Sequence, residues 1–132
     1  NKRNIEKTQQ QIDAGTLERI AEFNRKRNWD KFHNPKDLAI SISLEAAELL
    51  ECFQWSGQDL DVAEKRDRLA EETADVLIYS LLMCQILQVD PDVIINQKLD
   101  LNERKYPFEQ AYGTALKYTE LTPDDPQDGD RT

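Results

Sequence analysis

Two pairs of carboxylates with the same spacing are the residues of this chain best suited to chemistry. Glu45 and Glu48 lie three residues apart in an apolar segment, and Glu72 and Asp75 repeat that spacing in the next apolar segment. In an α-helix, residues three apart lie on the same face. Mg²⁺ is commonly bound by a few carboxylates together with waters and substrate phosphates. The two pairs therefore predict a Mg²⁺ site between two helices.

The helical projection of the first pair separates it from ordinary surface acids. At about 100° per residue, the apolar residues between Leu38 and Cys52 form one stripe. Glu45 falls in the middle of this stripe and Glu48 at its edge, whereas Glu51 falls on the opposite face. Glu51 is therefore predicted to be a surface acid, with a contact to a second metal ion as the alternative.

The second pair lies on a segment that is predicted to be largely buried. The sequence from Val76 to Leu87 is apolar on nearly every face of a helix. Just before and within it, Glu72, Asp75 and Tyr79 share a narrow stripe. Ionised carboxylates are costly to bury unpaired, and four of them repel one another, so we expect a cation among them.

Alternative roles for the four acids require partners that the sequence does not clearly supply. A structural network in which Glu45 and Glu48 bond to Lys or Arg of another helix stays open. A di-iron site requires Glu-x-x-His motifs, but the single histidine, His33, lies in a loop before the second helix. The chain also has no Gly-rich phosphate loop, which excludes P-loop enzymes. A Mg²⁺ site is the simplest interpretation.

The elements that position these residues are predicted to be helices. Only four Gly and five Pro occur, and no run of alternating β-branched residues indicates a strand. Asn34 and Pro35 suit the start of a helix, and the Asp90–Pro91 junction ends one helix and opens the next. The expected helices are residues 16–28, 35 to Gly57, from after Asp59 or Asp61 to Gln88, and 91–105, followed by a weaker segment 108–118.

These elements predict an all-α fold with a four-helix bundle-like core, a C-terminal helical extension and a disordered tail. The length of 132 residues suits one domain, which we place at residues 1–121. Residues 122–132 are rich in Pro, Asp and Gly and carry no apolar side chain, so they are predicted to be the disordered tail.

Charge and cysteine content limit the partners and the compartment. With 26 acidic and 17 basic residues, the net charge is −9, which opposes attraction to nucleic acid polymers and to anionic membranes. A small anionic substrate requires a divalent cation or a local basic patch to reverse this field. Cys52 and Cys84 form neither a CxxC motif nor a disulfide framework, and no apolar stretch approaches the length of a membrane span. A cytoplasmic protein is expected.

Several further motifs accompany the acidic pairs. They are WDKFHNP at residues 29–35, FQW at 53–55, DVLIY at 75–79, KLDLN at 98–102 and KYTEL at 117–121. In this order, with the two acidic pairs, they resemble the MazG-like all-α nucleoside triphosphate pyrophosphohydrolases, and in particular their dCTP pyrophosphatase branch. The resemblance runs from about Thr16 to Leu121.

The resemblance implies a metal-dependent hydrolase. Glu45, Glu48, Glu72 and Asp75 would hold Mg²⁺, and Glu45 or Glu48 would position or deprotonate the attacking water. The reaction would convert a deoxynucleoside triphosphate, with dCTP as the leading candidate, into the monophosphate and pyrophosphate. The family also implies a homotetramer built as a pair of dimers. Two alternatives stay open, namely a non-enzymatic helical interaction module and a metal-dependent phosphohydrolase of another nucleotide, such as a phosphoribosyl compound.

The same resemblance implies which residues bind the nucleotide. The base would lie among aromatic and imidazole side chains, namely Trp29, His33, Trp55 and Tyr79. The phosphates would contact a polar stripe on the fourth helix, Lys98 and Asn102. Phe32 is equally explained by core packing, and Lys105 by a solvated face. Vertebrate relatives carry a His nine residues before the first Trp, where this chain has Ile20, so the base preference is left open.

Overall fold

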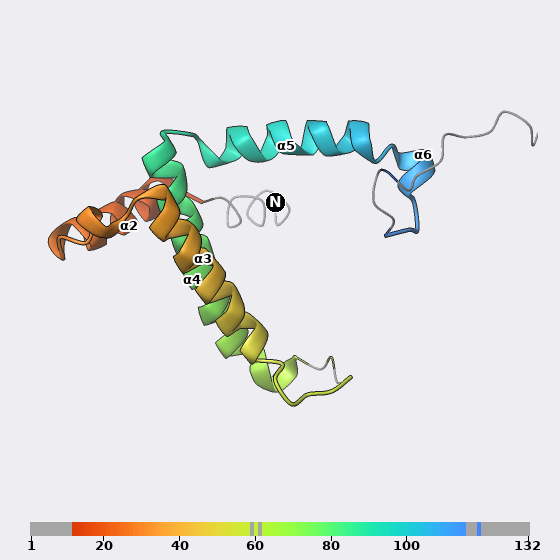
Figure 1. Cartoon of the computed structure of the whole chain (residues 1–132), viewed down its shortest axis with the longest axis horizontal. Helices are drawn as coiled ribbons and strands as arrows, with labels where there is room; N and C mark the ends of the chain where they lie inside the picture. The colour runs from red at the N-terminus through yellow and green to blue at the C-terminus, as the bar shows by residue number, and fades with distance from the viewer. Residues whose placement is uncertain (1–11, 59, 61, 116–118, 120–132) are drawn as a thin grey trace, which may run out of the picture. The chain divides into compact units, whose positions relative to one another are not determined.

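The computed structural model describes residues 12–58, 60, 62–115 and 119, and all regular elements within them are helices (Figure 1). The chain divides into two compact units, residues 1–89 and 90–132. The elements are α2 (Ala14–Lys26), η1 (Asp30–Phe32), α3 (Pro35–Glu51), η2 (Ala63–Lys65), α4 (Arg66–Leu87), α5 (Pro91–Lys105) and α6 (Phe108–Ala111). The predicted all-α class is confirmed. The predicted tail, residues 122–132, lies outside the described residues, and the single domain stays a prediction.

The hairpin of α3 and α4 forms the core of the first unit. Helix α4 returns alongside α3, and α2 packs against α4 (Figure 1). The buried apolar side chains come from both arms of the hairpin and are Leu38, Cys52, Leu81 and Leu82. Burial of such side chains is the main favourable contribution to folding. The pairing of α3 with α4 therefore stabilises this unit and also sets which side chains of the two helices meet.

Side-chain caps define where three of the helices begin. Asn34 Oδ1 accepts a hydrogen bond of 2.9 Å from the backbone N–H of Asp37, and Pro35 occupies the first turn of α3. Asp90 caps α5 in the same way by accepting from Asp92 N–H at 2.8 Å. Asp13 caps α2. The predicted start of α3 and both predicted ends of α5 are confirmed.

The connection between α3 and α4 is longer than the sequence predicts. Helix α3 ends at Glu51 rather than near Gly57, because the next backbone N–H groups bond to carbonyls three residues earlier and Trp55 adopts a left-handed φ of 69°. Helix α4 begins at Arg66, after the short helix η2, and not directly after Asp59 or Asp61. The predicted boundaries at both ends of this connection were wrong.

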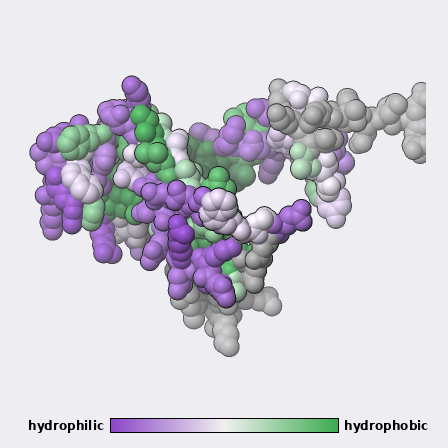
Figure 2. All heavy atoms as spheres, turned by 60° about the horizontal axis from the view of Figure 1, so that its bottom comes forward, coloured by the Kyte–Doolittle hydropathy of each residue, from purple (hydrophilic) through white to green (hydrophobic). Residues whose placement is uncertain are grey.

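Large apolar side chains are exposed along the hairpin. Leu44 and Leu50 of α3 are 61% and 71% exposed, and Leu77 and Leu87 of α4 are 50% and 54% exposed. Hydrophobic residues, drawn in green, lie open on the face shown in Figure 2. The prediction that residues 76–87 are largely buried was therefore wrong for a single copy of the chain. Their apolar faces exceed what the first unit can cover by itself.

Among the described residues, no single helix is long and apolar enough to cross a membrane. Only the segments 63–87 and 91–105, which are separate helices, reach the required length and composition when taken together.

The burial of Leu38 predicts a large effect on stability. Leu38→Ala should lower the free energy of unfolding by about 2–5 kcal/mol, because the side chain is 0% exposed and its removal leaves a cavity. Leu60→Ala, at a residue that is 82% exposed, should change it by less than about 0.5 kcal/mol. Urea unfolding at a single protein concentration measures both changes. Equal effects of the two substitutions would contradict the position of the core.

Candidate active site

Three carboxylates meet where α3 and α4 face each other. Glu45 comes from α3, and Glu72 and Asp75 come from α4. Each offers one oxygen, and these three oxygens lie within 4.8 Å of one another. The pairing of the two helices produces this approach, because each acid lies on the side of its helix that faces the other. We call these three residues the acidic cluster.

Two oxygens of the acidic cluster are buried without a partner. Within the described part of the chain, no group forms a hydrogen bond with Glu45 Oε2 or Glu72 Oε2. A buried oxygen left unpaired costs about 1–3 kcal/mol, and more when it is charged. A hard divalent cation with oxygen ligands would satisfy both atoms and offset the repulsion. The donor set thus fits a metal ion.

Burial and mutual repulsion raise pKa values within the acidic cluster. Burial, a hydrogen bond with the Glu48 side chain and the charges of Glu48, Asp75 and Glu72 raise the pKa of Glu45 to about 7. The pKa of Glu72 is raised by burial and by its hydrogen bond with Glu48. A hydrogen bond between two carboxyl groups requires a proton on one of them. Without a cation, burial and the neighbouring carboxylates therefore favour the protonated form of Glu45 more than water does.

Glu48 joins the cluster from its edge. It is exposed, in agreement with its predicted place at the edge of the apolar stripe of α3. Its side chain bonds with both Glu45 and Glu72. All four predicted acids thus interact around one point, whereas Glu51, one turn further along α3, is exposed at the surface.

Tyr79 and His33 lie beside the acidic cluster. Tyr79 follows Asp75 by one turn of α4, and burial together with the charges of Glu45 and Asp75 raises the pKa of its hydroxyl. The ring of His33 meets the ring of Tyr79 edge to face, with 6.4 Å between the ring centroids. No described residue is a hydrogen-bond partner of the buried His33 Nδ1. This ring nitrogen is therefore a buried polar atom without a partner in the described part of the chain.

A pocket of about 660 Å³ adjoins the cluster between α2 and α4. Its lining includes Ile20, Phe23, Asn24 and Trp29 on one side and Asp75 and Tyr79 on the other. The rings of Phe23 and Trp29 pack edge to face with centroids 5.8 Å apart. Pockets of about 300–1,000 Å³ with mostly apolar walls are typical of small-molecule sites. Two residues of this lining connect it to the acidic cluster. Asp75 is a member of the cluster, and Tyr79 interacts with its charges.

Some predicted residues lie elsewhere. Trp55 follows the end of α3, is 93% exposed and does not line the pocket of Trp29. Lys98 and Asn102 lie on α5 in the second unit, so their part in the site stays a prediction.

The sequence interpretation missed Asn24, a buried residue of the pocket wall. The signal that could have found it was its position. Leu17, Ile20 and Asn24 follow one another at i, i+3 and i+7 and therefore share a face of α2. A polar side chain in line with two apolar ones on such a face indicates a buried amide.

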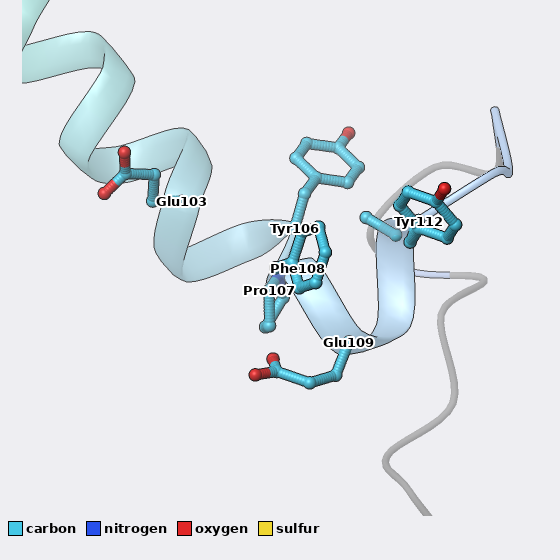
Figure 3. Close-up of a pocket in the computed structure, with 7 residues that line it drawn as sticks. Glu103, Tyr106, Pro107, Phe108, Glu109 and Tyr112 are labelled. Carbon is cyan, nitrogen blue, oxygen red and sulfur yellow. The ribbon is translucent and has the colours of Figure 1, made fainter.

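The second unit contains a different pocket of about 680 Å³. Figure 3 shows Tyr106, Phe108 and Tyr112 with the acids Glu103 and Glu109 around it. The rings of Phe108 and Tyr112 lie 5.4 Å apart. None of the residues predicted for the site lines this pocket.

Comparison with known proteins relates this chain to pyrophosphatases. The model of the MazG-like family matches residues 40–121. Human dCTP pyrophosphatase 1 is 38% identical over 115 residues, which cover 80% of this chain and 68% of the human protein, and the Bos taurus protein of the same name is 37% identical over the same length. The crystal structure of a pyrophosphatase from Archaeoglobus fulgidus shares 47% sequence identity with a TM-score of 0.63, and covers 69% of this chain and 88% of that one. These findings agree with the resemblance inferred from the motifs.

The raised pKa of Glu45 predicts how stability depends on pH. Because the pKa rises from 4.5 to about 7 on folding, the folded chain binds more protons than the unfolded chain between these values. Without metal, the thermal midpoint should therefore fall by a few degrees between pH 5 and pH 8. Glu45→Gln should remove most of this fall and raise the midpoint at pH 8.

Glu71→Gln, at an exposed acid next to Glu72, serves as the control and should keep the pH dependence of the original chain. Scanning calorimetry in the presence of a chelator measures all three midpoints. If Glu45→Gln leaves the pH dependence unchanged, the assigned origin of the shift is wrong.

Proposed function

The chain belongs to the MazG-like nucleoside triphosphate pyrophosphatases, and on this basis we propose that its substrate is dCTP and its cofactor is Mg²⁺. The products are dCMP and pyrophosphate. One observation carries the proposal. The acidic cluster, with two unpaired buried oxygens, shares Asp75 with a pocket large enough for a nucleobase.

The residues that would hold Mg²⁺ are Glu45, Glu72 and Asp75, with Glu48 at the edge of the group. When bound, Mg²⁺ would neutralise the triphosphate, stabilise charge in the transition state and lower the pKa of a water. The carboxylates keep this region negative. It therefore attracts a cation and repels a triphosphate until that cation is bound. The net charge of −9 likewise repels an anionic substrate unless a cation is bound.

Glu45 and Glu48 are proposed to act on the water that attacks. A carboxylate within hydrogen-bond reach of a water can act as its general base, and these two carboxylates lie together at the acidic cluster. One of the two carboxylates accepts a proton from the water while the oxygen of the water forms a bond to phosphorus. The bond that breaks is the α–β anhydride, and its electron pair leaves with the product whose phosphorus the water does not attack.

The pocket of Trp29 is proposed to hold the base. Stacking of a base on an aromatic ring contributes about 1–3 kcal/mol. Trp29 lines the pocket, and the edge-to-face contact with Phe23 holds its ring in place. The ring of His33 contacts the ring of Tyr79, which lines the same pocket. Trp55, Lys98 and Asn102 are proposed to complete the base and phosphate contacts.

The two cysteines are free thiols, as expected for the reducing cytoplasm in which we propose that the protein works.

The hydrolysis itself is tested with a panel of nucleotides. With Mg²⁺, dCTP should give pyrophosphate and not phosphate, and a chelator should abolish turnover. Glu45→Gln and Asp75→Asn should each lower kcat/KM at least about a hundredfold, because each removes a metal ligand. Glu71→Gln, at an exposed neighbour of the cluster, should retain full activity. Release of phosphate, or full activity of Glu45→Gln, would contradict the proposal.

We further propose a homotetramer built as a pair of dimers. The supporting observation is the apolar surface that a single chain leaves open, to which Leu44, Leu50 and Leu77 contribute. A groove of about 450 Å³ runs along the same part of α4, and its lining is mostly apolar, with Val62, Leu69, Ala70, Ala74 and Leu77 beside Arg66 and Thr73. Burial of apolar area contributes about 25 cal/mol per Å², so a second copy on this face gains stability. The exposed Trp55 would then be free to contact a neighbouring subunit.

Light scattering at micromolar concentration tests the assembly. The expected mass is about four times the 15.3 kDa of the chain. Leu77→Asp should lower the mass because it places a charge in the proposed contact, whereas Leu60→Asp, in the connection between α3 and α4, should not change it. A monomeric mass for the original chain would refute the assembly.

A further inference from the structure

Asn24 is a buried polar side chain in the wall of the pocket between α2 and α4. It is 4% exposed, and among the described residues it is the only polar residue in the buried class. Its neighbours in the pocket wall include Ile20, Phe23 and Trp29. Buried amides are normally paired at both ends, so each end of this one requires a partner.

The hydrogen bonds of Asn24 fix which end of its amide is free. The Nδ2 group donates to the carbonyl oxygen of Ile20 at 2.9 Å. Turning the amide over would bring two oxygens together, so the Nδ2 end must face Ile20. Among residues 12–58, 60, 62–115 and 119, no group donates to Asn24 Oδ1. The free group in the pocket is therefore a hydrogen-bond acceptor.

The backbone of Asn24 is hydrogen-bonded to that of Trp29, whose ring lines the same pocket. Its carbonyl oxygen accepts hydrogen bonds from the N–H groups of Arg27, at 3.2 Å, and Trp29, at 3.0 Å. The amide and the indole are thus held by one short segment at the end of α2. In small-molecule sites, a few fixed polar groups within an apolar wall set the orientation of the ligand.

On the basis of the proposed function, we propose that Asn24 Oδ1 accepts a hydrogen bond from the exocyclic amino group of the base and so selects cytosine over uracil and thymine. Cytosine carries an amino donor at position 4, whereas uracil and thymine carry a carbonyl oxygen there. A carbonyl oxygen opposite Oδ1 would place two acceptors against each other without a donor between them. Adenine carries the same donor, so Asn24 selects for an amino group and not for ring size.

A structural role for the Asn24 amide predicts a different result. The bond from Nδ2 to the carbonyl four residues earlier also occurs at Asn96, which donates to Asp92 O at 2.7 Å on an exposed part of α5. If the amide only stabilised its helix, replacement would lower stability and leave the preference between bases unchanged. Asn96 is therefore the matched control, since it makes the same bond without lining the pocket of Trp29.

The first experiment uses the unaltered protein with Mg²⁺. The values of kcat/KM are compared for dCTP, dUTP, dTTP and a dCTP analogue that carries hydrogen in place of the 4-amino group. We expect dCTP to exceed each of the others by at least about tenfold, the size expected when one buried hydrogen bond is lost. This comparison does not depend on the folding of any variant.

The second experiment measures the same ratios in variants. Asn24→Ala and Asn24→Leu, of which the second keeps the side-chain volume, should bring the ratio of dCTP to the 4-hydrogen analogue close to one. Asn96→Ala should leave it unchanged. The coupling between the substitution and the missing amino group isolates their interaction from any general loss of activity.

The outcomes separate this inference from the proposed function. If no nucleotide is hydrolysed, the proposed function fails, and the role of Asn24 fails with it. If nucleotides are hydrolysed to pyrophosphate without a preference for the amino group, or if Asn24→Leu keeps that preference, the role of Asn24 alone is refuted.

Discussion

Repulsion among carboxylates held between α3 and α4 is the constraint on which the rest of the site depends. The hairpin brings Glu45, Glu72 and Asp75 together, although their like charges and unpaired oxygens oppose this approach. Folding therefore supplies the free energy that keeps them close, and either a proton or a cation relieves the repulsion. The same arrangement that destabilises the metal-free chain prepares it to bind a divalent ion.

Helix α4 connects this charge chemistry with the recognition of a ligand. Asp75 belongs to the acidic cluster and also lines the pocket, and Tyr79 follows one turn later. Because both side chains project from one rigid helix, the distance between the acidic cluster and this pocket is set by the helix itself. Helix α2 supplies the opposite wall of the pocket, including Asn24 and the residues that support Trp29.

The small core of a single chain is the physical reason for the proposed homotetramer. Only Leu38, Cys52, Leu81 and Leu82 are buried apolar residues in the part of the chain that is described, while many large apolar side chains of the helices are open. A hairpin that also holds repelling acids needs further apolar burial to be stable. A second copy against these faces would provide that burial and bring exposed residues such as Trp55 to a neighbouring subunit.

The sequence by itself determined the all-α class, the capped starts of α3 and α5, and the four acids. These features depend on local spacing and on side chains that bond within one turn, as Asn34 does. Local patterns did not predict the early end of α3 at Glu51, because the tight turns and the left-handed Trp55 that follow it interrupt an otherwise helical sequence.

Only the tertiary structure decided which faces meet. The spacing within α2 puts Asn24 on the same face as Leu17 and Ile20, but its burial was decided by the packing of that face on α4. The sequence likewise placed Glu45 on an apolar face of its helix. Its approach to Glu72 and its raised pKa arise only once α3 and α4 have paired. Side chains on one helix are positioned by its repeat, but contacts between helices depend on the packing of the whole unit.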